Sequence, residues 1–104
     1  MKLYFYKLNT DERYGKTGIT VQVCEAEEKP KTYKAVRGSF PNCLSIVRKD
    51  EAGQLNYDCL FLTEPNFEYA KEEFRLRTER IIAGKLKKIE NLKAELKIIN
   101  ESEE

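Results

Sequence analysis

The side chains of this chain that could do chemistry are mainly cations, because histidine is absent and only three cysteines are present. Without histidine the chain has no Ser–His or Cys–His pair for nucleophilic catalysis, and it lacks the commonest metal ligand. The spacings GxSxG, SxxK and HExxH are absent as well. We therefore expect no enzymatic activity, no cofactor and no metal site.

Two weaker catalytic candidates have simpler explanations. The GKT at residues 15–17 has the form of the end of a phosphate-binding loop, but position 10, where that loop needs a glycine, is Thr10. We interpret it as a turn between two strands. The cysteines show no CxxC spacing and are expected to be reduced thiols that pack as small hydrophobic residues. They are Cys24, Cys43 and Cys59.

Positive charge is concentrated in two stretches, although the formal net charge of the chain is only +1. The stretch 29–49 has no acidic residue, and its cations are Lys29, Lys31, Lys34, Arg37, Arg48 and Lys49. The stretch 75–88 has Glu79 as its one acidic residue, and its cations are Arg75, Arg77, Arg80, Lys85, Lys87 and Lys88. From these stretches we select as ligand- or partner-binding residues Lys31, Tyr33, Arg37, Arg48, Arg77, Arg80, Lys87 and Lys88.

These residues would recognise an anion. The arginines would hold phosphates or carboxylates in bidentate fashion, and Tyr33 would stack on a base. Strand alternation predicts that Lys31, Tyr33 and Arg37 share one face. On a helical wheel the cations of the second stretch form a stripe of about 100° opposite the apolar arc, with Gly84 at its centre. The alternative is an ordinary solvated helix face and a lysine-protected edge strand.

Residues 1–62 are expected to form short strands, because β-branched and aromatic residues cluster in runs bounded by turn formers. The expected strands are residues 3–8, 18–25, 31–37, 43–49 and 55–62. Residues 50–53 would form a hairpin turn between the last two. The simplest arrangement is an antiparallel meander of four or five strands.

A long amphipathic helix is expected at residues 63–100, followed by a disordered tail at 101–104. Thr63 would cap it, and Pro65 fits its first turn. A helix of this length, about 54 Å, is far longer than strands of about 20 Å. Gly84 leaves open one helix or two helices with a break there. The expected fold class is therefore α+β, within a single domain covering residues 1–104.

Part of this helix has the spacing of an oligomerisation seam. The seam residues are Ile82, Leu86, Ile89, Leu92, Leu96 and Ile99. If Ile89 occupies heptad position a, a parallel dimer would place Lys88 opposite Lys93, so we favour antiparallel association. The alternative is that this face folds back on the sheet of its own chain.

Three segments together resemble small accessory proteins of bacteriophages and prophages of low-GC Gram-positive bacteria. The segments are MKLYFYK (1–7), EAEEKPKTYKAV (25–36) and FLTEPNFEYAKEEF (61–74), and the arginine-rich RLRTER (75–80) departs from that layout. The resemblance implies a protein that acts without catalysis, by occupying or sequestering a host component such as a defence protein or its nucleotide signal.

From these observations we expect a non-enzymatic binding protein of phage type, whose partners are itself and a host protein or an anionic nucleotide. It would act as an anti-defence inhibitor or as a sponge for the nucleotide. The alternatives are a nucleic-acid-binding regulator and a purely structural oligomer. No apolar run approaches the roughly 18 residues of a membrane span, and the N-terminus is too polar for a signal peptide, so we expect a cytoplasmic location without membrane partners.

Overall fold

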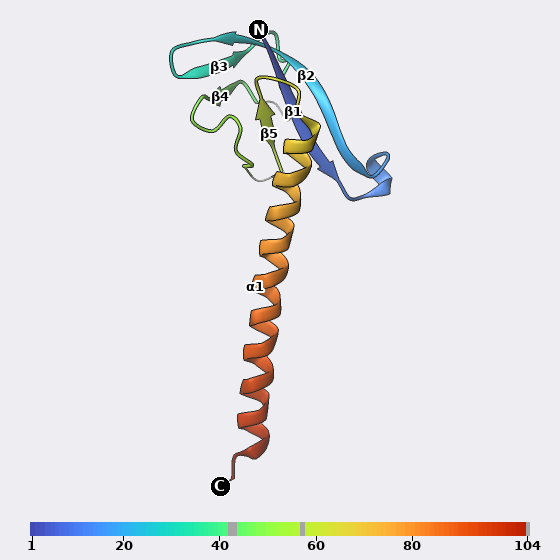
Figure 1. The fold of residues 1–104 in the computed structure, drawn as a ribbon, viewed down its shortest axis with the longest axis vertical. Coiled ribbons are helices and arrows are strands. Elements are labelled where there is room, and N and C mark those ends of the chain that lie inside the picture. Colours follow the sequence, from blue (N-terminus) through green and yellow to red (C-terminus); the bar gives the residue numbers. More distant parts are fainter. Residues whose placement is uncertain (42–43, 57, 104) are drawn as a thin grey trace. The chain divides into compact units, whose positions relative to one another are not determined.

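The computed structural model describes residues 1–41, 44–56 and 58–103. It has a five-stranded antiparallel sheet followed by one long helix, which confirms the predicted α+β class (Figure 1). The elements are β1 (Lys2–Asn9), the 3₁₀ helix η1 (Glu12–Tyr14), β2 (Gly18–Glu28), β3 (Thr32–Ala35), β4 (Ile46–Arg48), β5 (Leu60–Leu62) and α1 (Phe67–Glu101). The chain divides into two compact units, Met1–Phe74 and Arg75–Glu104, and each is described by itself.

The strand order is β4-β3-β2-β1-β5. Strands β1 to β4 form the predicted antiparallel meander. The fifth strand differs from the prediction, because β5 pairs with β1, with Phe5 opposite Phe61, and not with β4. Residues 50–53 therefore do not join two paired strands; instead the backbone N–H of Gly53 donates to the carbonyl of Phe61 at 2.8 Å.

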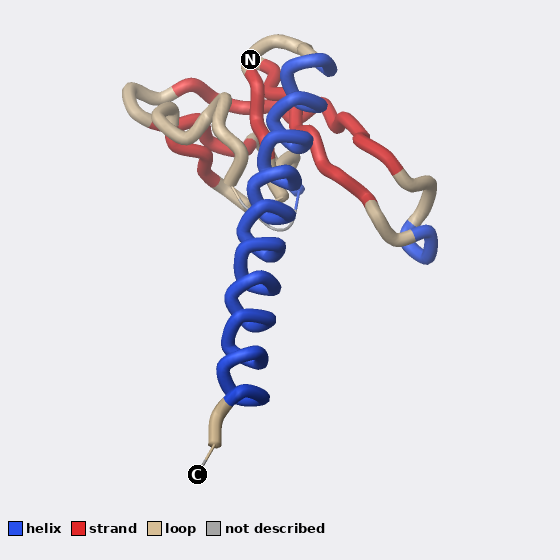
Figure 2. Tube along the Cα trace, turned by 60° about the horizontal axis from the view of Figure 1, so that its bottom comes forward, coloured by secondary structure: helices blue, strands red, loops and turns tan. Residues whose placement is uncertain are grey.

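Strand β2 is long enough to pair with two different neighbours. Its first part runs along the whole of β1, from Gly18 opposite Asn9 to Glu25 opposite Lys2, and its last residues pair with β3. Strand β5 pairs with β1 only at residues 4–6, so the far ends of β1 and β2 pair with each other alone among the described residues. They form a two-stranded arm that ends at η1 (Figure 2).

The larger core cluster contains residues from all five strands, which requires a curled sheet. Val47 lies on β4 and Phe61 on β5, at opposite edges of the sheet, yet both belong to this cluster. In a flat sheet the two edges would be about 19 Å apart. The ring of Phe61 packs at 5.0 Å from the ring of Phe5 and at 5.5 Å from that of Phe40, measured between centroids. The curl therefore brings the two sheet edges to the same core.

The helix begins at Phe67 rather than at the predicted Thr63, because Asn66 is the residue that caps it. The side-chain oxygen of Asn66 accepts a hydrogen bond from the backbone N–H of Tyr69 at 3.0 Å. The backbone N–H of Asn66 in turn donates to the hydroxyl of buried Tyr6 at 2.9 Å. Ala70 and Phe74 pack with Tyr6 in the second core cluster.

The helix continues without a break through Gly84 to Glu101. Of the two alternatives left open by the sequence, one long helix is the one observed. Glu101 is helical and does not belong to a tail, because the helical hydrogen-bonding pattern extends to this residue. The Ser102 hydroxyl then donates to the Ile98 carbonyl at 2.7 Å, which provides a partner for one of the last carbonyls of the helix.

Candidate binding surfaces

The helix of the Arg75–Glu104 unit carries an apolar arc along one side. All six predicted seam residues lie in it, and their exposed fractions run from 48% for Ile89 to 61% for Ile99. The two buried residues of α1, Ala70 and Phe74, both precede this unit. About half of each seam side chain is therefore available to a partner.

Basic side chains lie on the remaining surface of the same helix: Arg80 and Lys87 lie opposite the arc, whereas Arg77 and Lys88 lie closer to one of its edges. Arg80, Lys87 and Lys88 are exposed, whereas Arg77 is half-buried. A Cβ added at Gly84, in the middle of this stripe, would meet no atom within 4 Å. The helix thus brings together four of the predicted binding residues, and Gly84 leaves space for the close approach of an anion.

A second basic site lies in the sheet unit, where the turn between β2 and β3 adjoins the end of β4. Pairing of Thr32 with Arg48, and a 2.9 Å hydrogen bond from the Lys49 amide to the Lys31 carbonyl, bring Lys31 and Arg48 together. They line a hollow of about 430 Å³ whose other residues are Pro30, Thr32, Lys49 and Asp50. The charges are partly compensated, because Arg48 pairs with Asp50 at 2.9 Å and Lys49 with Glu28 at 3.0 Å.

Tyr33 is in the core and not at this surface. Its exposed fraction is 9%, and it packs with Val47 and other residues of the larger core cluster. The Lys49 ammonium lies 5.4 Å from the centre of its ring, as a cation–π contact. This burial is the opposite of what base stacking by Tyr33 requires.

The predicted shared face of Lys31, Tyr33 and Arg37 is also not observed. Strand β3 contains only Thr32–Ala35, so Lys31 and Arg37 lie in the flanking turns, where strand alternation does not apply. Arg37 is exposed with a positive φ of 50°. Lys49 takes the place of Arg37 beside Arg48, and its position in the basic stretch 29–49 was the signal that could have identified it.

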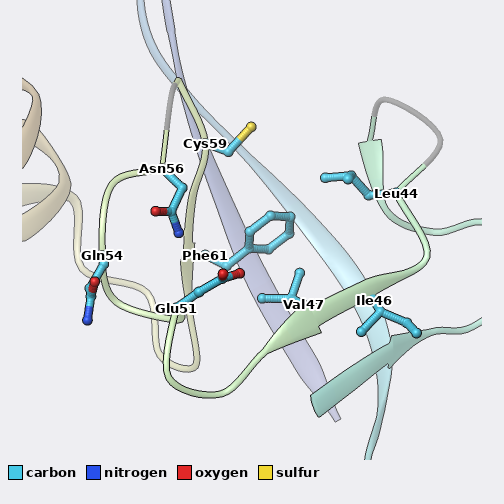
Figure 3. A pocket seen from close by; sticks show the side chains of 8 residues that line it. All are labelled: Leu44, Ile46, Val47, Glu51, Gln54, Asn56, Cys59 and Phe61. Atoms are coloured by element: carbon cyan, nitrogen blue, oxygen red, sulfur yellow. The ribbon is translucent and has the colours of Figure 1, made fainter.

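A pocket of about 430 Å³ lies between β4 and β5, and nothing in the sequence indicated it. Figure 3 shows the ring of Phe61 at its centre, with Val47 and Leu44 on one side and the Glu51 carboxylate directed toward it. The pocket exists because the curled sheet brings both of its edges to one place. Its lining residues all lie between Leu44 and Phe61, but they come together through the pairing of β5 with β1, which no local sequence pattern predicts.

The thiols that the structure describes have the properties of core groups. Cys24 is fully buried and Cys59 is half-buried, and burial raises the pKa of both thiols. The nearby Asp58 charge raises the pKa of Cys59 further. A reactive thiol needs the opposite shift. Cys43, the third predicted core thiol, lies outside the described residues.

Within residues 1–41, 44–56 and 58–103, no three cysteine or carboxylate side chains form a group that could hold a metal ion. In the same part of the chain, no helix combines the length and apolar character of a membrane span. Comparison of the chain with protein-family models, with curated proteins and with solved structures finds no match. The function of the chain therefore has to be argued from its own surfaces.

Proposed function

We propose that this chain is a non-enzymatic binding protein that self-associates through the helix of its Arg75–Glu104 unit and uses the basic side of that helix to hold an anionic partner. The partner class is a nucleotide, or an acidic face of a host protein. This is the mode of action expected of a phage accessory protein that sequesters a host factor. The observation that supports the proposal is the helix itself, which has an exposed apolar arc on one side and exposed cations on the other.

The apolar arc supports self-association on energetic grounds. Fully burying one Leu or Ile side chain stabilises a protein by roughly 1.5–3 kcal/mol. Because each seam residue is about half exposed, covering it would contribute about 1 kcal/mol per residue in each copy. Six such residues in each of two copies offer a gain comparable to the roughly 4–15 kcal/mol lost on association. A copy of the same helix is a partner that offers an identical apolar arc and is present wherever the chain is.

The basic side supports an anionic ligand of limited size. Arg80, Lys87 and Lys88 form no ion pair with any residue that the structure describes. The whole chain carries a formal net charge of only +1, so long-range attraction to an extended polyanion is weak. A compact anion that contacts the stripe directly fits this distribution better than a nucleic acid does.

The test is light scattering after size-exclusion chromatography, with native mass spectrometry of the same peak. We expect a dimer or a larger species, together with a co-purified small anion or with binding of added nucleotides. The double variant Arg77→Glu, Arg80→Glu should lose anion binding. Its far-UV circular dichroism spectrum and its oligomeric state should stay unchanged. The matched control is Lys2→Glu, Lys16→Glu, which makes the same change in net charge at exposed lysines outside the stripe.

Three results would contradict the proposal. The first is a monomer at all concentrations, and the second is equal loss of anion binding in the stripe variant and in the control. Turnover of a nucleotide by the pure protein would exclude the non-enzymatic assignment. Tight binding of duplex DNA that falls steeply with added salt would instead favour a nucleic-acid-binding regulator.

A further inference from the structure

The seam of the Arg75–Glu104 helix can be assigned to heptad positions. With Ile89 at position a, Ile82 and Leu96 also take position a, and Leu92 and Ile99 take position d. The helix is continuous through this segment, so the heptad register holds from one end of the seam to the other. The charged residues that flank the seam then occupy defined positions, with Lys88 and Glu95 at g and Lys93 at e.

In a parallel pair, position g of one helix lies opposite position e of the next heptad in its neighbour. Lys88 of each copy would then lie opposite Lys93 of the other. This makes two like-charge contacts by symmetry, at the flank of the seam. Glu95 would lie opposite Asn100 and would compensate neither of these like-charge contacts.

In an antiparallel pair, position g lies opposite position g. When Ile89 of one copy packs against Leu92 of the other, Ile82 packs against Ile99, and Lys88 lies opposite Glu95. Symmetry makes two ion pairs. If the helices slide by one heptad toward the C-terminus, Glu95 lies opposite Glu95 and Lys93 opposite Lys93, so the charges also select this register.

The remaining cations of the seam fit the same register. Lys93 lies opposite Leu86 of the other copy, where the alkyl part of its side chain can cover the leucine while its ammonium stays in water. Lys85 occupies position d opposite Leu96, and a single lysine in a seam lowers stability while fixing the register. Both lysines are exposed in the single chain, and in the pair their long side chains would extend past the seam to keep the ammonium groups in water.

From this charge pattern we infer that the second copy binds antiparallel, with Lys88 of each chain paired to Glu95 of the other. The inference rests on the self-association proposed above and deepens it. Twofold symmetry places the axis between residues 90 and 91. The N-terminal ends of the two seams, at Ile82, are then about 25 Å apart along the helices, whereas a parallel pair would place them side by side.

The experiment measures the dissociation constant of self-association by sedimentation equilibrium at low salt, for the full chain and three variants. For Lys88→Glu we expect the dissociation constant to be roughly ten- to thirtyfold higher, because two attractive contacts become repulsive. Within one helix the introduced glutamate lies three residues after Lys85, which favours the helix, so weaker association cannot come from loss of helicity. The double variant Lys88→Glu, Glu95→Lys should restore the affinity. Lys87→Glu, on the outer side of the helix, is the matched control and should change it less than threefold.

Each other outcome overturns a specific step. Tighter association of Lys88→Glu would show a parallel pair, because the introduced carboxylate would then lie opposite Lys93, and self-association itself would stand. Failure of the double variant to restore affinity, or equal weakening by Lys87→Glu, would exclude the Lys88–Glu95 contact. A wild-type chain that stays monomeric would overturn self-association and the antiparallel pair together. The charge effects should also shrink as salt is added.

Discussion

Replacement of Tyr6 by phenylalanine should destabilise the Met1–Phe74 unit through a single hydrogen bond. Tyr6 is only 2% exposed, and its hydroxyl oxygen accepts a hydrogen bond from the backbone N–H of Asn66 at 2.9 Å. Asn66 is the residue whose side chain caps α1, so this bond ties the start of the helix to strand β1. The phenylalanine ring keeps the packing against Leu60 and Phe74 but leaves the Asn66 N–H without its partner.

The size of the effect follows from the surroundings of this N–H group. Leaving a buried donor unsatisfied costs roughly 1–3 kcal/mol. Asn66 is itself exposed, so water can partly replace the lost acceptor, and we expect about 1–1.5 kcal/mol, at the low end of that range. For a unit of this size the melting temperature would fall by roughly 4–12 °C.

The assay is urea and thermal unfolding followed by far-UV circular dichroism, which does not depend on the tyrosine that is removed. Tyr4→Phe is the matched control: Tyr4 lies on the same strand and is half-buried, and its hydroxyl has no hydrogen-bond partner among the described residues. The control should change the free energy of unfolding by less than about 0.5 kcal/mol. Equal effects of the two substitutions would refute the role assigned to the Tyr6–Asn66 bond.

Two further predictions concern the helix and the thiols. Gly84→Ala should stabilise α1 by about 1 kcal/mol in thermal unfolding, because the added methyl group has free space, and it should weaken anion binding if the anion approaches the backbone there. Cys24 and Cys59 should react with a thiol reagent at pH 8 more slowly than free cysteine, with rates that still rise where free cysteine has levelled off, because burial raises both pKa values. The same raised pKa values make stability fall as pH increases through the alkaline range, since the folded state retains the thiol protons longer. Mass spectrometry of the modified chain and unfolding at several pH values check these two expectations.

The elements that local patterns define were predictable, and the elements that long-range pairing defines were not. Runs of β-branched and aromatic residues and the apolar arc of the helix are properties of neighbouring residues, so β1, β2 and α1 could be predicted from them. The partner of β5 depends on which edge lies free when the sheet curls. No residue near Leu60 carries that information. The helix start shows the same limit, because Thr63 and Asn66 are both good caps, and Tyr6, sixty residues away in sequence, supports Asn66.

The candidate site residues show the same distinction between local patterns and long-range pairing. The helical stripe and the seam depend only on helical periodicity, and one continuous helix carries all of their residues, while their roles in binding and association stay predictions. The basic cluster of the sheet depended on strand boundaries, and the shift from residues 31–37 to Thr32–Ala35 removed Lys31 and Arg37 from the strand. Tyr33 stayed in the strand but faces the core. An aromatic residue between lysines is compatible with either face until the neighbouring strand is known.

The two units differ in how far they bury their apolar residues, and this difference links folding to association. The Met1–Phe74 unit buries its own two clusters, which contain the buried residues of the described chain. In the Arg75–Glu104 unit no described side chain falls in the buried class, so its helix relies mainly on intrinsic propensity and on side-chain pairs such as Arg75–Glu79. Propensity alone leaves isolated helices marginal in water, and tertiary packing normally supplies the rest. A second helix that covers the arc would supply this packing, so helix formation beyond Phe74 and self-association should behave as one concentration-dependent equilibrium, while the sheet unit stays folded on dilution.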